Sequence, residues 1–403
     1  MTHNATGRLT DALAVAAEPS PFQSFWMGGF ECSSHRRRDG ARVDVVAASG
    51  HDRAAAADYR QLAAHGIRTV RDGVRWPLVE RSPGRYDWSS FLPQLRAARE
   101  TETQVIWDLC HYGVPDGLDV WGPTFVRRFE AFARAAAEVV RSETDGVPWW
   151  CPVNEISFWS WAGGDAGYLP PFANGRGFEL KVQLARAALG GVDAVRDVDR
   201  RARLLWAEPA IHVACDPSRP HDAPHAEGHR LAQFQAWDLL AGHLWPQVGG
   251  SEDVLDVLGV NYYPTNQWVH GGPPIGRGHP QYRPLRRILT EVAARYGRPV
   301  VVAETGSEGD ERAEWLRYVA GEVRAARAAG VRLDGVCWYP IANHPGWDDD
   351  RHCPNGLLGY LDPDGARPVH APLARELARW RARLPSPVPA SAPRRAEPAS
   401  GSP

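Results

Sequence analysis

The sequence contains a single lysine, Lys181, and has no marked excess of either charge. Its 46 lysine and arginine residues nearly balance 48 aspartate and glutamate residues, which gives a formal net charge of −2. A nucleic-acid-binding protein normally carries a clear basic excess, so this class is disfavoured. The sequence also lacks an apolar run near the roughly 18 residues of a membrane span, and its first twenty residues lack the pattern of a signal peptide. We therefore expect a cytoplasmic protein that binds neither nucleic acid nor a membrane.

The cysteines form neither a CxxC pair nor a regular disulfide framework. Four of the six lie in apolar, strand-like segments, where a free cysteine usually behaves as a small buried hydrophobic residue. A chain of 403 residues can bury a large core without a disulfide or a metal. The six positions are Cys32, Cys110, Cys151, Cys215, Cys337 and Cys353.

Short β-branched or aromatic segments alternate along the chain with longer amphipathic ones. Helix-like segments include residues 52–66, 123–141 and 311–330, with a last helix around 371–383. Eight alternating units are typical of a (β/α)8 TIM barrel, which we expect as a single domain over residues 21–384. The strand-like segments span residues 25–32, 69–76, 104–112, 149–156, 203–210, 256–263, 299–306 and 333–340.

An open, doubly wound sheet is the second fold that this alternation could produce. That fold would favour a glycine-rich phosphate loop after an early strand, and both GxGxxG and GxxxxGK[ST] are missing.

Residues 1–20 show no clear pattern and are expected to be flexible. Residues 385–403 are rich in proline, alanine and serine, which predicts a disordered tail.

The carboxyl ends of the predicted strands carry polar residues, as expected where a barrel binds a polar ligand. Two of them, Glu155 and Glu304, follow the fourth and seventh strands and would enter the cavity from opposite sides. Two carboxyl groups about 5–5.5 Å apart suit retaining glycoside hydrolysis, in which one attacks and the other protonates the leaving oxygen. The full set of strand-end residues is Glu31, Arg71, Asp72, Asp108, His111, Asn154, Glu155, Glu208, Asn261, Tyr263, Glu304 and Trp338.

The motifs that carry these two glutamates resemble those of the family 1 β-glycosidases, which are (β/α)8 barrels. CPVNE, ending at Glu155, is similar to that family's TFNE, and VVAETG, containing Glu304, is similar to ITENG. The resemblance implies that Glu155 is the acid/base, that Asn154 contacts the sugar 2-hydroxyl, and that Glu304 is the nucleophile.

Four further motifs extend the resemblance from about residue 25 to about residue 361. VRDGVRWP resembles YRFSISWP and implies a site arginine at Arg71, and LCHYGVP resembles LYHWDLP and implies a sugar contact at His111. GVNYY matches GINYY, so Tyr263 would touch the nucleophile, while the neighbouring Tyr262 would point away and pack. CWYPIANH resembles VWSLLDNF and implies that Trp338 floors the sugar pocket.

Two sugar-binding residues of that family are missing. Its N-terminal glutamine is absent, and Glu31 lies in that region instead. The glutamate of DNFEW is replaced by Pro345, with Trp347 and the acidic residues 348–350 after it. A phosphosugar is disfavoured on charge, because Lys181 is far away in the sequence and the region is acidic. The resemblance therefore implies the family's chemistry without its preference for glucose or galactose, and Glu31 and Trp347 become candidate sugar contacts.

Three other features are ambiguous in the sequence. Trp159 and Trp161 could stack on sugar rings or belong to the core. Glu208 could be a third carboxylate of the cavity or an ion-pair partner of an arginine. The last feature is a segment with helical histidine spacing, in which a metal site is disfavoured because prolines interrupt it; it contains His212, Cys215, His221, His225 and His229.

The sequence thus predicts a retaining β-glycosidase that acts on a carbohydrate without a cofactor or a metal. Glu304 would attack the anomeric carbon, and Glu155 would protonate the leaving oxygen and then activate water. A transglycosidase could use the same residues, and a non-catalytic carbohydrate-binding barrel is the alternative from another class. The motifs leave the sugar, exo or endo action and the oligomeric state open.

Overall fold

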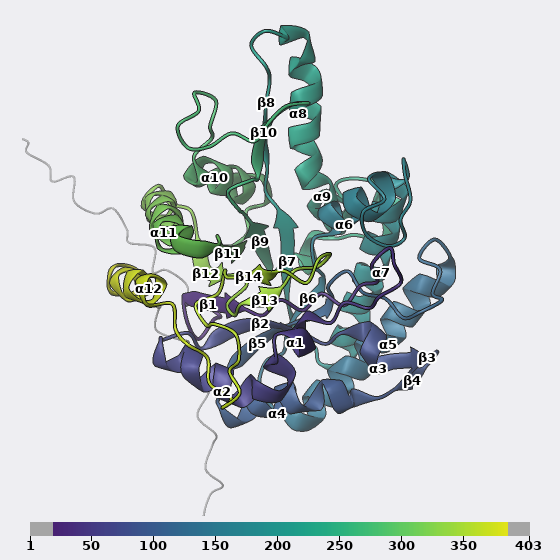
Figure 1. Ribbon diagram of the computed structural model, residues 1–403. Helices are drawn as coiled ribbons and strands as arrows, with labels where there is room; N and C mark the ends of the chain where they lie inside the picture. Colours follow the sequence, from purple (N-terminus) through teal and green to yellow (C-terminus); the bar gives the residue numbers. More distant parts are fainter. Residues whose placement is uncertain (1–18, 386–403) are drawn as a thin grey trace, which may run out of the picture.

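A computed structural model describes residues 19–385 and contains a closed barrel of eight parallel strands (Figure 1). Each predicted strand is present, although most end two to three residues before the predicted boundary. The predicted flexible segment 1–20 and the predicted tail 385–403 lie almost wholly outside the described residues. In order around the barrel, the strands are β1 (Trp26–Gly29), β2 (Thr69–Gly73), β5 (Gln104–Cys110), β6 (Trp149–Val153), β7 (Arg203–Pro209), β9 (Val257–Asn261), β11 (Val300–Thr305) and β12 (Leu333–Trp338).

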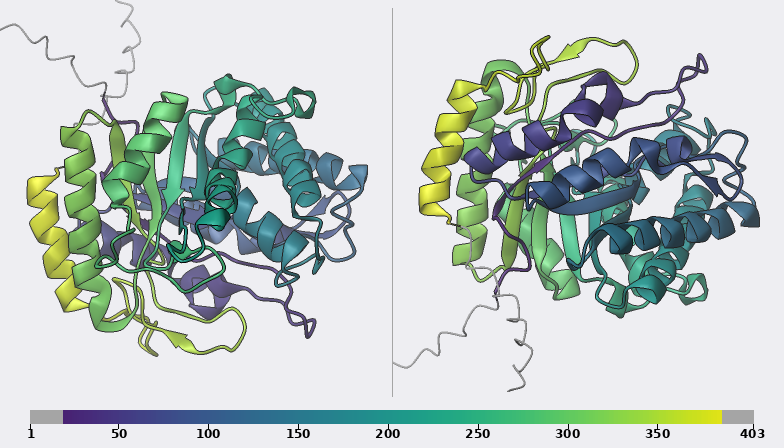
Figure 2. Two further views of the ribbon diagram at one scale, coloured as in Figure 1. Left: turned by 90° about the horizontal axis from the view of Figure 1, so that it is seen from above. Right: turned by 90° about the horizontal axis from the view of Figure 1, so that it is seen from below.

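Helices cover the outside of the barrel, and the (β/α)8 prediction is confirmed (Figure 2). The four helix-like segments named from the sequence correspond to α2, α5, α11 and α12, with ends that differ by at most two residues. No helix in residues 19–385 is long and apolar enough to cross a membrane. The helices are α1 (Val45–Ala48), α2 (His51–Ala64), α3 (Trp76–Val79), α4 (Leu92–Glu100), α5 (Pro123–Glu143), α6 (Ile156–Trp159), α7 (Gly177–Val198), α8 (Ala223–Leu231), α9 (Gln235–Ala241), α10 (Leu285–Tyr296), α11 (Arg312–Ala328) and α12 (Ala371–Arg383).

The loops between these elements contain three small two-stranded sheets. The parallel pair of β8 and β10, together with α8, forms an arm that projects beyond the carboxyl ends of β7 and β9 (Figure 1). Their strands are β3 (Glu80–Ser82), β4 (Arg85–Tyr86), β8 (His212–Ala214), β10 (Gln267–Val269), β13 (His344–Pro345) and β14 (His352–Cys353).

Side chains alternate along each strand between the barrel interior and the helical layer, because successive residues of a strand point to opposite faces. In β7, Leu205 and Ala207 belong to the inner apolar cluster, whereas Trp206 belongs to the outer one. The inner cluster fills the lower part of the barrel, so the polar residues that follow the strands are held above a packed floor. Cys32, Cys110, Cys151 and Cys337 are buried and unpaired, as predicted.

A buried ion network outside the barrel fixes β2, the strand that carries Arg71. His51 of α2 lies between Asp58 and Asp72, with nitrogen–oxygen distances of 2.7 and 2.9 Å. Tyr59 also donates to Asp72, at 2.5 Å. Burial opposes protonation of His51, but the carboxylates of Asp72 and Asp58 prevail and raise its pKa.

Replacing His51 by glutamine is expected to lower the free energy of unfolding by about 3 kcal/mol, because the buried carboxylate of Asp72 loses its cation and Asp58 keeps only Arg367. Since the folded pKa of His51 is raised, its contribution is complete below the unfolded pKa of about 6.5 and is lost as the pH rises through the folded pKa. Urea denaturation at several pH values measures this. A difference between the two proteins that stayed constant at high pH would contradict a charged His51.

Candidate active site

Arg71 is the centre of a hydrogen-bonded cluster at the carboxyl ends of four strands. It is 1% exposed and donates to Asp108 at 2.6 Å and to Asn154 Oδ1 at 2.8 Å. It also donates to Glu304 Oε1 at 2.9 Å. The structure therefore brings together the predicted residues of β2, β5, β6 and β11, and Asp108 is the carboxylate that holds the guanidinium in place.

Glu304 is buried at the end of β11 and has two donors. Arg71 bonds its Oε1, and the hydroxyl of Tyr263 donates to its Oε2 at 3.0 Å. Burial raises the pKa of Glu304, while the positive charges of Arg71 and His111 act in the opposite direction. Tyr262, next to Tyr263, points away and stacks on Trp315 with ring centroids 5.8 Å apart, as predicted.

Glu155 follows β6 with a backbone φ of 48°, a conformation that non-glycine residues rarely adopt. Tyr112 donates to its Oε2 at 2.6 Å, and Asn261 donates to its Oε1 at 3.0 Å. Both donors are neutral. Burial and the nearby charge of Glu304 raise the pKa of Glu155 to about 8.

The two glutamates thus differ in what stabilises their negative charge. Glu304 has a direct ion pair with Arg71, whereas Glu155 has only neutral donors and the repulsion of Glu304. When two buried carboxyl groups compete for one negative charge, the charge resides beside the cation. We therefore assign the carboxylate to Glu304 and the proton to Glu155 at neutral pH.

His111, Asn154 and Glu31 form one side of the site. His111 Nδ1 lies 3.0 Å from Asp108, and its Nε2 lies 3.2 Å from the Asn154 amide nitrogen and 3.7 Å from Glu31 Oε1. Burial lowers the pKa of His111, but the carboxylates of Glu31 and Asp108 outweigh it and raise the value. Glu31, expected near the site on position alone, thus lies against the predicted sugar-contacting histidine.

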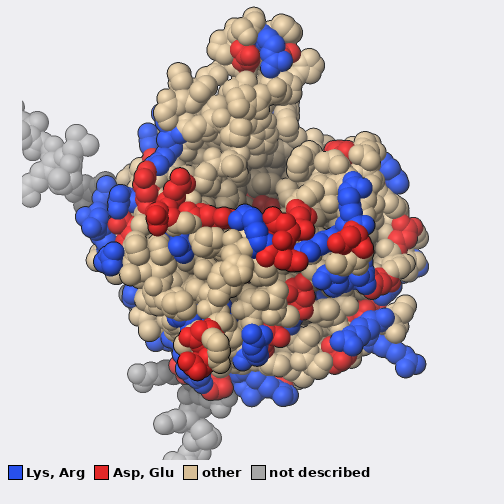
Figure 3. Space-filling view, viewed as in Figure 1, with Lys and Arg blue, Asp and Glu red and all other residues tan. Residues whose placement is uncertain are grey.

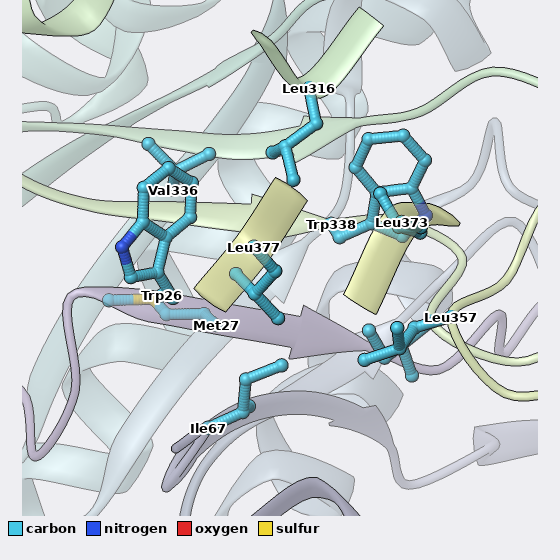
Figure 4. A pocket seen from close by; sticks show the side chains of 10 residues that line it. Trp26, Met27, Ile67, Leu316, Val336, Trp338, Leu357, Leu373 and Leu377 are labelled. Carbon is cyan, nitrogen blue, oxygen red and sulfur yellow. The ribbon is translucent and has the colours of Figure 1, made fainter. Parts of the chain in front are cut away.

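Trp338 does not line this site, and that prediction was wrong. It points outward from β12 into the helical layer, where its indole Nε1 donates to Asn355 O at 2.8 Å. There it borders a cavity of about 10 Å³, near the minimum for one water molecule, beside Trp26 and Leu377 (Figure 4). Alternation along the strand places Cys337 and Tyr339 inward instead.

Tyr339 occupies the position expected of Trp338. Its ring lies parallel to that of His111, with centroids 6.0 Å apart, and the Arg71 guanidinium carbon is 5.3 Å from its centroid. The aromatic floor of the site is therefore a tyrosine from the next position of the chain. The motif match had the correct strand and a register shifted by one residue.

Trp347 lies at the edge of the site, half-buried. Its ring is 5.5 Å from that of Tyr112 and 6.4 Å from that of Phe158. The ring of Phe158 also contacts that of Trp161, with centroids 5.9 Å apart, and Trp161 is 53% exposed. Trp159 is fully buried, with its Nε1 bonded to Pro170 O, and is a core residue. Of the two ambiguous tryptophans, only Trp161 is available for a sugar.

The sequence motifs predict no role for Tyr112 or Tyr339, and they place Asn261 only at the end of a strand. Asn261 and Tyr112 are the two residues that hold Glu155, and Tyr339 is the floor. Two features of the sequence could have pointed to these residues: Asn261 lies at the end of β9, and Tyr112 is the residue after His111. Neither feature indicates that the side chain would contact Glu155.

Glu208 lies outside the cavity. It is 1% exposed, and its Oε2 accepts the backbone N–H of Ser157 at 2.9 Å. Burial raises its pKa to about 7, and the positive charge of Lys181 acts in the opposite direction. It is therefore neither a third cavity carboxylate nor an arginine partner, the two roles that the sequence left open.

The histidine segment is more helical than the prolines suggested. Pro224 lies in the first turn of α8 and does not prevent this helix, which carries His225 and His229. Their ring centroids lie 6.4 and 6.2 Å from that of His270. In residues 19–385, one group of three side chains has atoms that could coordinate a metal within 4.8 Å of one another. It consists of Cys32, Asp108 and His111.

The residues of that trio do not fit a metal. Asp108 already accepts from Arg71 and contacts His111. Burial and the charge of Asp108 raise the pKa of the Cys32 thiol well above its usual value, which opposes the thiolate that a metal requires. The trio is better described as part of the hydrogen-bond network around Arg71.

The surface is hollowed below the arm of β8, α8 and β10, on the side of the barrel where β7 and β9 end (Figure 3). Fold and site together define a (β/α)8 barrel with two buried glutamates, one paired with an arginine, at the carboxyl ends of its strands. Ligand sites of such barrels lie at this end.

No protein-family model and no curated protein matches the chain. Among solved structures, a β-glucosidase from Thermotoga maritima in complex with glucoimidazole matches with a TM-score of 0.74 and 15% identity, covering 89% of this chain and 98% of that one. A family 1 β-glucosidase from the same organism matches with a TM-score of 0.73 and 15% identity over 91% and 99% of the two chains. The chain thus resembles family 1 β-glucosidases in fold over almost its whole described length.

Proposed function

We propose that the protein is a retaining β-glycosidase. The observation that carries this proposal is the contrast between the two glutamates. Glu304 lies against Arg71 and Tyr263, while Glu155, which follows β6, has neutral donors and a pKa of about 8. A charged nucleophile and a protonated acid are the two states that double displacement requires at its start.

In the first step, Glu304 attacks the anomeric carbon while the bond from that carbon to the leaving oxygen breaks. Glu155 gives its proton to that oxygen, so the leaving group departs as an alcohol. Arg71 and Tyr263 stabilise the negative charge of Glu304 before the attack, and this charge decreases as the covalent bond forms. The oxygen of Asn154 accepts from Arg71 and its amide nitrogen lies 3.2 Å from both His111 Nε2 and the Tyr112 hydroxyl, so its contact with the sugar 2-hydroxyl stays a prediction.

In the second step, Glu155 is a carboxylate and takes a proton from water, whose oxygen attacks the anomeric carbon. Glu304 leaves with the electrons of its bond, and Arg71 again stabilises its charge. Tyr112 and Asn261 donate to Glu155 whether or not it carries a proton, which keeps it oriented through both steps. Two inversions leave the configuration unchanged.

Two further observations support a carbohydrate substrate. The solved structures with this fold include β-glucosidases, and the motifs around Glu155 and Glu304 resemble those of family 1. The rings of Tyr339, Trp347 and Trp161 around the site suit the apolar faces of sugars.

The reaction is tested with a panel of aryl β-glycosides followed by proton NMR during the first minutes. We expect one or more members to be cleaved, with the β-anomer of the free sugar appearing before mutarotation produces the α-anomer. First appearance of the α-anomer would contradict the double displacement. Glycosyl transfer to an added alcohol in place of hydrolysis would indicate a transglycosidase, and binding without turnover would indicate a carbohydrate-binding barrel.

A further inference from the structure

The loop that follows β1 places an anionic group where a sugar would lie. Residues 30–35 are all buried, although this segment has no regular secondary structure. Within it, Glu31 is 7% exposed, and its Oε1 accepts both the backbone N–H and the hydroxyl of Ser33. The carboxylate is thus held by its own loop and faces the site beside His111.

Only one oxygen of Glu31 is used by the protein. In the described part of the chain, Oε2 has no hydrogen-bond donor, and it is not among the polar atoms sealed from solvent. Burial opposes ionisation of Glu31, but His111, His344 and Ser33 outweigh it and lower its pKa. A free, charged acceptor with this degree of burial is open to a donor from a ligand, and a cationic donor forms the strongest hydrogen bond with it.

Of the two histidines near Glu31, His111 is already paired with Asp108, and His35 carries no charge. His35 is 2% exposed, its Nδ1 has no partner, and burial lowers its pKa to about 4, so it is neutral. His111 has both ring nitrogens engaged, with Asp108 and Asn154. An ammonium group has three donors, and Glu31 Oε2 can accept one of them.

The arginines at the edge of the site are already neutralised. Arg37 bonds Asp350, and Arg351 forms a two-pronged pair with Glu308 at 2.8 and 2.9 Å. Basic and acidic side chains alternate along this edge of the hollow (Figure 3). A sugar carboxylate or phosphate that approached Glu31 would therefore find Arg37 and Arg351 already paired.

We propose that Glu31 selects a glycone that carries a protonated amino group, and that the site disfavours uronic and phosphorylated sugars. This inference rests on the proposed glycosidase function and adds to it the class of substrate. The ammonium group would donate to Glu31 Oε2 while the anomeric carbon lies at Glu304.

The test compares aryl β-glycosides that differ in one group: the neutral parent, its amino analogues at each ring position, and the uronide. We expect one amino analogue to have a kcat/KM at least about tenfold above the parent, and the uronide to have the lowest value. Glu31→Gln should lower kcat/KM for that analogue about 100-fold and change the parent less than about fivefold, since only a charge-assisted bond is lost. Glu143→Gln removes a charge from the far end of α5 and should leave the ratio unchanged.

Two results would overturn the inference. The first is a wild type that prefers the neutral parent or the uronide to every amino analogue, which needs no variant and so does not depend on folding. The second is a Glu31→Gln protein, with an unfolding midpoint close to that of the wild type, that retains the amino preference. Cleavage of the parent alone refutes only the amino selectivity, whereas cleavage of no glycoside refutes the proposed function and the inference with it.

Discussion

Replacing Glu304 by alanine is expected to lower kcat for aryl β-glycosides by about 10⁵-fold, because the group that forms the covalent intermediate is gone. The space left beside Arg71 and Tyr263 can then admit a small anion, which Arg71 would stabilise as it does the carboxylate. Added azide should restore turnover and produce the α-glycosyl azide, since a single displacement inverts the configuration.

The azide product is identified by NMR, and the stability of the variant is checked by thermal unfolding. Glu304→Gln is the matched control, because it keeps the side-chain volume, fills the space and should not be rescued. Unchanged activity in Glu304→Ala would show that Glu304 is not the nucleophile. An azide product with retained configuration would show that a second group still attacks the sugar.

The fold was predictable because alternation of strand and helix is a property of local sequence. Each β-branched segment became a barrel strand, and helices such as α5 and α11 have their apolar side toward it. The barrel topology then places all strand ends together. Arg71, Asn154 and Glu304 were therefore expected to meet before any contact between them was known.

The error at Trp338 follows from the period of a strand. A shift of one residue in a motif match moves a side chain from the inside of the barrel to the outside. Cys337 and Tyr339 are apolar enough to fill the interior, so the residue types of CWYP do not reveal the register. The register depends on pairing with neighbouring strands, and Trp338 pairs with Gly28 and Thr305 in the structure.

The donors to Glu155 could not be predicted for a different reason. Tyr112 and Asn261 lie 43 and 106 residues away from Glu155 in the sequence. Tyr112, whose backbone has a φ of 64°, places its hydroxyl 2.6 Å from Glu155 Oε2. Local sequence patterns carry no information about such pairings, so Glu155 could be proposed as the acid/base from the sequence, whereas the groups that set its pKa could not.

Arg71 links the two halves of the proposed mechanism. It bonds Glu304 directly and also bonds Asn154, whose amide nitrogen contacts both His111 and the Tyr112 hydroxyl. Tyr112 in turn donates to Glu155. The same network that holds the nucleophile charged therefore extends to the donor that orients the acid.

Replacing Glu155 by alanine is expected to have an effect that depends on the leaving group. For glycosides of poorly acidic alcohols, which need protonation on departure, kcat/KM should fall by about 10⁴-fold, the upper range for general acid catalysis. For 2,4-dinitrophenyl glycosides, whose leaving group departs as an anion, kcat/KM should fall less than about tenfold. The second step still lacks its base, so these substrates should show a burst followed by slow turnover.

The pH dependence supplies the control for this assignment. Since the acid works in its protonated form and its pKa is raised to about 8, wild-type kcat/KM should be retained at neutral pH and should fall as the pH rises through about 8. With the 2,4-dinitrophenyl substrate, Glu155→Ala should lack this alkaline limb. If the limb persisted unchanged, the titrating group would be another residue, and the neutral donors around Glu155 would have to be explained without a role in proton transfer.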